Sequence, residues 1–157
     1  MAVYIEKSYI FVADYYKSDY TMIKYTPEII SELKPNEIFV FGSNTAGMHG
    51  AGAARVAHRS FGAEMGVGEG LTGQTYAFPT LDANLNQVKE AEFRQSMKIF
   101  IRHVLENPDK TYYLTKIGCG IAGWSIEEVR GFLWSALDEE NHSKLPKNLI
   151  IPIEFRI

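Results

Sequence analysis

Apolar residues follow two patterns along this chain: short continuous runs, and longer stretches with helical spacing. Residues 38–41, Ile-Phe-Val-Phe, form a continuous run of the kind that a strand buried on both faces needs. Comparable runs predict further inner strands at residues 75–78, 112–117 and 149–153. Apolar residues spaced for one helical face predict helices over residues 51–61, 86–106 and 125–140.

Capping residues mark the starts of two helices. Thr26, Pro27 and Glu28 match an N-cap, a proline at the first helical position and an acid in the first turn. They predict a short helix over residues 26–33. The last helix has Ser125 followed three residues later by a glutamate, which is the spacing of a capping box.

Strands that alternate with helices predict an α/β fold, specifically a three-layer α/β/α sandwich around a central mixed, mostly parallel sheet. The first 25 residues, rich in Tyr, Ile, Val and Thr, favour one or two strands at the start of a sheet. Residues 62–73 hold five glycines and predict a long flexible loop. No repeat or linker interrupts the 157 residues, so we expect a single domain over residues 1–157.

The most informative segment is FVFGSNTAGMHGAG, residues 39–52, in which an apolar strand runs into a glycine-rich loop that opens a helix. Glycine lacks a Cβ, so backbone N–H groups of such a loop can approach an anion closely. The unpaired N–H groups of the helix add partial positive charge at the same place. The segment therefore predicts a site for an anionic ligand, and a tight strand-to-helix connection built for close packing is the plainer alternative.

Two other loops beside predicted strands are also rich in glycine, residues 118–123 and 66–73. Ligands of open α/β sheets bind at the carboxyl ends of the strands. Loops that converge there would line a cleft with backbone N–H groups, which suits a diphosphate. The chain has no P-loop, because no glycine loop is followed by Gly-Lys-Ser/Thr.

Composition narrows the function classes. The net charge is −3, with 16 basic and 19 acidic residues and no basic run, which disfavours bulk nucleic-acid binding. Charges interrupt the apolar N-terminal residues, so neither a signal peptide nor a membrane span fits. The single cysteine excludes an internal disulfide and a cysteine-based zinc site. The histidines show no metal-ligand spacing, and we expect a cytoplasmic protein without metal or cofactor.

Two motifs together resemble the macrodomain family, the ADP-ribose-binding module. FVFGSN is similar to the family's strand that ends in an asparagine contacting the ribose furthest from adenine, which implies that role for Asn44. MHGAGAARVAHRSFG and KIGCGIAGWSIEEV resemble the terminal ADP-ribose protein glycohydrolase branch. The resemblance covers residues 37–137 and implies an ADP-ribose derivative as ligand, with an ADP-ribosylated macromolecule as a further partner to consider. It leaves the oligomeric state open.

The resemblance and the loop chemistry together yield a set of candidate ligand-binding residues. Glu28 lies where an acidic residue near the start of the chain often reads the adenine amino group, although helix capping also explains it. Trp124 would close over the ligand or anchor the core, and Cys119 would be a thiol of lowered pKa or a small buried side chain. The set is Glu28, Gly42, Ser43, Asn44, Gly50, Ala51, Gly52, Gly118, Cys119, Gly120, Ile121, Ala122, Gly123 and Trp124.

Departures from the resembled branch concern catalysis. Ala122 occupies the position of its aspartate, and Thr80 and Leu81 stand where its lysine would be expected. In hydrolytic macrodomains with a G-V-D-G-A phrase, the aspartate position corresponds here to His49, which could deprotonate a water, bind a phosphate or cover the loop. Asp82, just past a strand end, is the other candidate catalytic group, and a loop cap is its plainer role.

Three functions follow from these residues. The first is binding of ADP-ribose or a related metabolite or modification. The second is ADP-ribosyl hydrolysis through a nonstandard residue, which would be slow. The third is a dinucleotide oxidoreductase, which is weak because Arg55 stands where the third glycine of the fingerprint belongs and no acid ends a second strand.

Overall fold

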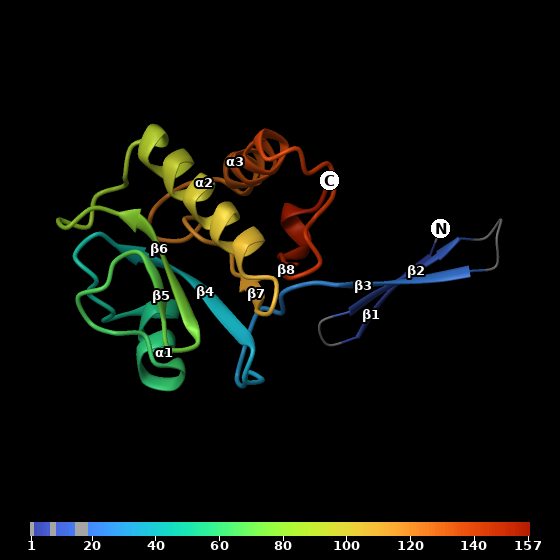
Figure 1. Ribbon diagram of the computed structural model, residues 1–157, viewed down its shortest axis with the longest axis horizontal. Helices are drawn as coiled ribbons and strands as arrows, with labels where there is room; N and C mark the ends of the chain where they lie inside the picture. The colour runs from blue at the N-terminus through green and yellow to red at the C-terminus, as the bar shows by residue number, and fades with distance from the viewer. Residues whose placement is uncertain (1, 7–8, 15–18) are drawn as a thin grey trace.

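The computed structural model describes residues 2–6, 9–14 and 19–157. Its central sheet has five strands in the order β5-β6-β4-β7-β8 (Figure 1). Strand β4 pairs in parallel with β6 and β7, β8 pairs in parallel with β7, and β5 is antiparallel to β6. The strands are β4 (Glu37–Asn44), β5 (Gly70–Thr72), β6 (Thr75–Leu81), β7 (Thr111–Leu114) and β8 (Leu149–Ile150). The predicted mixed, mostly parallel sheet is confirmed.

Helices cover both faces of this sheet, which gives three layers (Figure 1). Helix α1 (Gly52–Phe61) packs on one face, and α2 (Glu90–Glu106) with α3 (Ile126–Glu139) packs on the other. Successive residues of β4 point to opposite faces of the sheet, which explains why a separate core forms on each face. Ile38 and Val40 join the core under α2 and α3, while Phe39 and Phe41 join the core under α1. All four are at most 5% exposed, as the continuous apolar run predicted.

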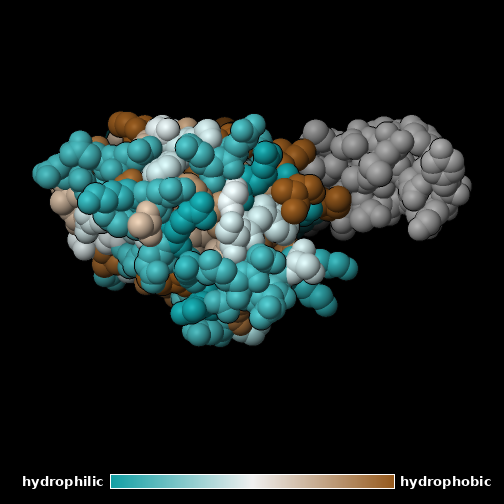
Figure 2. Space-filling view, turned by 90° about the horizontal axis from the view of Figure 1, so that it is seen from above, coloured by the Kyte–Doolittle hydropathy of each residue, from teal (hydrophilic) through white to brown (hydrophobic). Residues whose placement is uncertain are grey.

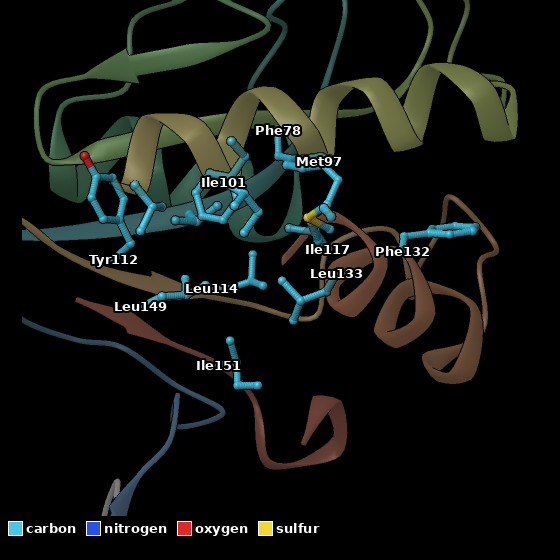
Figure 3. Packing of buried hydrophobic residues seen from close by; sticks show 14 of the residues in the cluster. Phe78, Met97, Ile101, Tyr112, Leu114, Ile117, Phe132, Leu133, Leu149 and Ile151 are labelled. Carbon is cyan, nitrogen blue, oxygen red and sulfur yellow. The ribbon is translucent and has the colours of Figure 1, made fainter. Parts of the chain in front are cut away.

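The core under α2 and α3 is built from large side chains. Figure 3 shows Met97 of α2 reaching toward Ile117, just past the end of β7, with Leu114 and Leu133 beside them. The capping box of α3 is present as predicted, because Ser125 Oγ accepts from the Glu128 N–H at 3.1 Å and the Glu128 carboxylate accepts from the Ser125 N–H at 2.8 Å. The surface in Figure 2 is largely hydrophilic over this part of the molecule.

The N-terminal segment forms a sheet of its own. Strands β1 (Ala2–Glu6), β2 (Tyr9–Asp14) and β3 (Asp19–Lys24) pair antiparallel in that order. The sequence predicted one or two strands here, and the structure has three, joined by two successive antiparallel pairings. Figure 1 shows this sheet to one side of the five-stranded sheet.

The predicted helix over residues 26–33 is wrong, because this segment has no regular structure. The Thr26 N–H donates to the Ile151 carbonyl at 2.8 Å, and its hydroxyl donates to the Ile150 carbonyl at 3.2 Å. Thr26 therefore hydrogen-bonds to the chain at and just after the end of β8 and does not cap a helix. So short a helix would also be marginal in water without strong tertiary support.

Several boundaries differ from the prediction for local reasons. Helix α2 begins at Glu90 and not at residue 86, because Val88 instead donates its N–H to the Thr80 carbonyl at 3.3 Å. The last strand ends early and is followed by a 3-10 turn, η1 (Ile153–Phe155). The loop expected over residues 62–73 contains β5. Over the described ranges, no helix has the length and apolar character needed to cross a membrane.

Candidate functional site

The carboxyl ends of β4, β6 and β7 line one cavity of about 570 Å³ together with the start of α1. This volume lies within the range of about 300–1,000 Å³ that is usual for small-molecule sites. The lining residues are Gly42, Ser43, Asn44, Met48, Gly50, Ala51, Gly52, Ala53, Ala54, Thr80, Leu81, Leu85, Thr115, Lys116, Ile117, Gly118, Gly120, Ile121 and Ala122. The loops after β4 and β7 thus meet at one site, as strand-end geometry suggested.

The start of α1 faces this cavity with its backbone donors free of a side-chain cap. Ala51 precedes the helix in an extended conformation and makes no capping hydrogen bond through its side chain. Gly52, Ala53 and Ala54 all line the cavity. The first N–H groups of a helix lack partners within the helix and carry its partial positive charge. This wall of the cavity is therefore suited to an anion.

Glycine at position 42 lets three strand ends approach one another. A Cβ built on Gly42 would lie 3.3 Å from Thr80 Oγ1 and 3.8 Å from the Gly118 amide nitrogen. Thr80 is buried, and its hydroxyl donates to the Ser43 carbonyl at 3.3 Å. A larger residue at position 42 would push apart the strands that form the floor of the site.

The third glycine-rich loop supports the site from behind and does not line it. A Cβ on Gly68 would lie 2.6 Å from the Asn44 carbonyl oxygen, and one on Gly47 would lie 2.4 Å from the backbone of Gly66. Ser43 Oγ donates a hydrogen bond to the Gly68 carbonyl. The segment from Gly66 to Gly68 therefore packs its backbone directly against the loop after β4.

The side chain of Asn44 shapes the loop that follows it. Its amide nitrogen donates to the Met48 carbonyl at 2.8 Å, and its oxygen accepts from the Met48 N–H at 3.1 Å. An asparagine amide can make further hydrogen bonds from both atoms. Asn44 therefore holds the loop closed while lining the cavity, and it retains capacity for a ligand.

Lys116 is the cavity-lining residue of most consequence that the sequence analysis missed. Among the described residues that line the cavity, it alone carries a charged side chain. Its ammonium lies 2.7 Å from a Glu28 carboxylate oxygen and 3.5 Å from one of Glu154. The hydrogen bond that Lys116 donates to Glu28 raises the pKa of Lys116. Glu28 itself is not a lining residue, so it acts at this site through Lys116.

Lys116 was missed because residues 112–117 were predicted as one strand. Strand β7 ends at Leu114, and the next three residues bend to line the cavity. The other lining residues that the sequence analysis did not select are Met48, Ala53, Ala54, Thr80, Leu81, Leu85, Thr115 and Ile117.

Besides Glu28, three predicted ligand contacts lie outside the cavity lining. Cys119 donates to the Ile117 carbonyl at 3.6 Å, and burial raises the pKa of its thiol to about 11, so a reactive thiolate is disfavoured. Trp124 packs its ring against Phe93 and Phe132 at 5.4 and 5.3 Å between centroids, which is the core-anchor role. Gly123 has a φ of 83° and turns the chain into α3.

The two candidate catalytic groups are engaged elsewhere. His49 is 2% exposed, and its Nε2 lies 2.9 Å from the Glu64 carbonyl oxygen. Asp82 Oδ1 accepts from the N–H groups of Asn84 at 2.8 Å and Asn86 at 2.9 Å, which is the role of a loop cap. Neither residue lines the cavity. In the described part of the chain, no group of His, Cys, Asp and Glu could hold a metal ion.

Comparisons with known proteins agree with this architecture. The macrodomain of Mycobacterium tuberculosis DarG matches with a TM-score of 0.60 and 20% identity, over 83% of this chain and 97% of that chain. A Bacteroides thetaiotaomicron protein of unknown function matches with a TM-score of 0.54 and 13% identity, over 78% of this chain and 90% of that chain. No family profile and no curated protein matches the sequence. The chain therefore has a macrodomain-like α/β/α fold.

Proposed function

We propose that this chain binds ADP-ribose, free or as part of a metabolite or modification, in the cavity at the strand ends. The observation that carries the proposal is the meeting of two glycine-rich loops and the uncapped start of α1 around one cavity in a macrodomain-like fold. Backbone N–H groups from residues 50–52, Gly118 and Gly120 would donate to the diphosphate. Lys116 lines the same site, but Glu28 and Glu154 offset its charge, so the backbone N–H groups would make the main contacts to the anion.

Binding is favoured over hydrolysis by the chemistry of the lining. Among the described residues that line the cavity there is no carboxylate, histidine or thiol. General acid–base assistance contributes about 10²–10⁴-fold to a rate, and alanine at position 122 supplies none. The resemblance to the glycohydrolase branch therefore supports at most slow hydrolysis, for which His49 and Asp82 stay the candidate groups.

Titration calorimetry with ADP-ribose tests the proposal. Gly50→Glu places a carboxylate at a lining position where an added Cβ meets nothing within 4 Å, so we expect it to abolish binding by charge repulsion and steric block. Gly52→Glu should act likewise, with added backbone strain because Gly52 has a φ of 57°. The matched control is Gly131→Glu on α3, where a Cβ also meets nothing within 4 Å. Unchanged affinity in folded Gly50→Glu would refute the site.

A second assay addresses catalysis and the alternative functions. Incubation with an ADP-ribosylated protein should release ADP-ribose slowly or not at all, and His49→Ala should leave ADP-ribose binding within about threefold, because His49 lies outside the cavity lining. Rapid release that survives in both His49→Ala and Asp82→Ala would show that an unrecognised group is catalytic. Hydride transfer with NAD would instead support the third function, a dinucleotide oxidoreductase.

We propose a cytoplasmic protein that acts as one domain, and that meets ADP-ribosylated macromolecules through this cavity without bulk binding to nucleic acid. The net charge of −3 and the lack of a basic run support the last point.

A further inference from the structure

Three large apolar residues stand exposed around the cavity. Met48, Leu85 and Ile121, here called the apolar rim, follow β4, β6 and β7 respectively, and all three line the cavity. They are 63%, 61% and 92% exposed. Single exposed apolar residues are ordinary, but a group of them at one cavity marks a place where an apolar part of a ligand or partner docks.

Leu85 occupies a backbone conformation that leucine avoids. Its φ is 63°, in the left-handed region, where the Cβ of a branched side chain is crowded. The other described residue of this kind that is not glycine is Asn141, with a φ of 61°. Asparagine tolerates this conformation and leucine does not, so the loop gives up stability to keep an exposed apolar side chain at position 85.

Hydrogen bonds hold all three loops in place. Asp82 accepts from two N–H groups around Leu85, and the Leu85 N–H donates to the Asp82 carbonyl at 3.1 Å. Asn44 fixes both backbone polar groups of Met48. Beside Ile121, the Ala122 carbonyl accepts from Gln87 Nε2 at 2.8 Å. The apolar rim is therefore presented by well-bonded loops, as a preorganised binding surface would be.

We propose that the apolar rim binds a flat, uncharged ring attached to the terminal ribose of a bound ADP-ribose unit, at the end away from adenine. The preferred ligands are then ADP-ribose compounds that carry such a ring, and free ADP-ribose binds more weakly. This inference rests on the proposed function, because the ADP-ribose unit places the ring at the rim.

The chemistry of the rim selects this class of ligand. A charged substituent would lose its hydration there without gaining a partner, because the one charged lining residue of the described chain, Lys116, is already paired with Glu28. A rigid ring buries apolar area without fixing many rotatable bonds, and a methionine sulfur packs well against ring edges. With a net charge of −3 and no basic run, the chain is a poor match for a polynucleotide, so the ring belongs to a small molecule.

Titration calorimetry with three ligands tests the inference on the full chain. NADH carries an uncharged dihydronicotinamide ring on the terminal ribose of its ADP-ribose unit, NAD carries the oxidised, positively charged nicotinamide ring there, and ADP-ribose carries adenine but no second ring. We expect NADH to bind about tenfold more tightly than ADP-ribose, with NAD between them. Leu85→Asn and Ile121→Ser should each weaken NADH binding by about fivefold and weaken ADP-ribose binding by a clearly smaller factor.

Two further measurements separate binding from folding. Leu85→Asn should raise the thermal midpoint of unfolding while it weakens NADH binding, because asparagine relieves the backbone strain. Ile99→Ser, a control on α2 at a residue 41% exposed, should change neither affinity. Equal affinities for NADH and ADP-ribose, or equal losses for both ligands in the rim variants, would overturn the inference alone. A failure of wild-type protein to bind ADP-ribose would overturn the proposed function.

Discussion

The two faces of the sheet are built from different side chains. Under α2 and α3, the core consists mainly of large aromatic and aliphatic residues, including Phe93, Phe100 and Ile101 at 0% exposure. Under α1, the described buried cluster contains three phenylalanines and four alanines. Two of these phenylalanines, Phe39 and Phe41, come from β4. The buried residues of α1 are Ala54, Ala57 and Phe61, so most of its contacts with the sheet are made by alanine.

This difference indicates a division of labour. Large side chains bury more apolar area, at roughly 25 cal/mol per Å², so the face under α2 and α3 contributes most of the stability. Small side chains let α1 approach the sheet closely, and its start then reaches the cavity between the strand ends. We therefore expect substitutions under α2 and α3 to change the free energy of unfolding alone. Substitutions under α1 should change ligand affinity as well.

The largest effect on stability should come from Phe100→Ala. Phe100 is 0% exposed and its ring lies 4.9 Å from that of Tyr76 and 6.1 Å from that of Tyr112. We expect a loss of about 3–5 kcal/mol in the free energy of unfolding, measured by urea denaturation. ADP-ribose affinity, measured well below the transition, should stay within about twofold. A large loss of affinity in the folded variant would contradict the division between the faces.

A matched pair of alanine-to-leucine substitutions compares the two faces directly. Ala57 of α1 is 0% exposed, and Ala136 of α3 is 3% exposed. Changing either to leucine overpacks its core, which typically costs about 1–3 kcal/mol. Ala57→Leu should also weaken ADP-ribose binding about tenfold, because it moves the start of α1, whereas Ala136→Leu should not. Calorimetry at equal fractions of folded protein checks this, and equal affinities in the two variants would count against the comparison.

The sheet and its helices could be predicted because they follow from local patterns. The continuous apolar run at residues 38–41 and the helical spacing of apolar residues in α2 and α3 indicate directly which residues are buried. The segment at residues 26–33 could not be, since its local signals favour a helix while its actual partner, Ile151, lies far along the chain. A long-range hydrogen bond of this kind leaves no mark in a local pattern.

The candidate site was predictable to the same extent. The convergence of residues 42–52 with residues 118–122 follows from the rule that ligands bind at strand ends. The environment of Lys116 does not, because its partner Glu28 is 88 positions away in the sequence. Nor does the exposure of Leu85, which depends on a backbone angle that the residue itself disfavours. Side-chain roles set by tertiary contacts or by strain required the structure.

Two glycine substitutions should act in opposite directions. Gly68→Ala would place a Cβ 2.6 Å from the Asn44 carbonyl oxygen, so we expect it to lower the free energy of unfolding by about 1–2 kcal/mol and to weaken ADP-ribose binding. Gly131→Ala on α3 meets nothing within 4 Å and should stabilise the protein by about 0.5–1 kcal/mol, because alanine favours the helix. Thermal unfolding and calorimetry measure both. A stabilising Gly68→Ala would mean that this loop does not press on the site.

The smallest expected effect is a pH dependence of stability that comes from His103 on α2. Burial, aided by Lys110, lowers the pKa of His103, whose Nε2 lies 2.7 Å from the Tyr112 hydroxyl oxygen. Between the lowered pKa and the usual value of about 6.5, the unfolded chain binds a proton that the folded chain does not. Stability therefore rises with pH through this window and falls as the pH drops below about 6.5. His103→Gln should flatten this part of the profile in urea titrations at pH 5.5 and 7.5, while leaving ADP-ribose affinity at pH 7.5 unchanged. An unflattened profile would assign the pH dependence to another group.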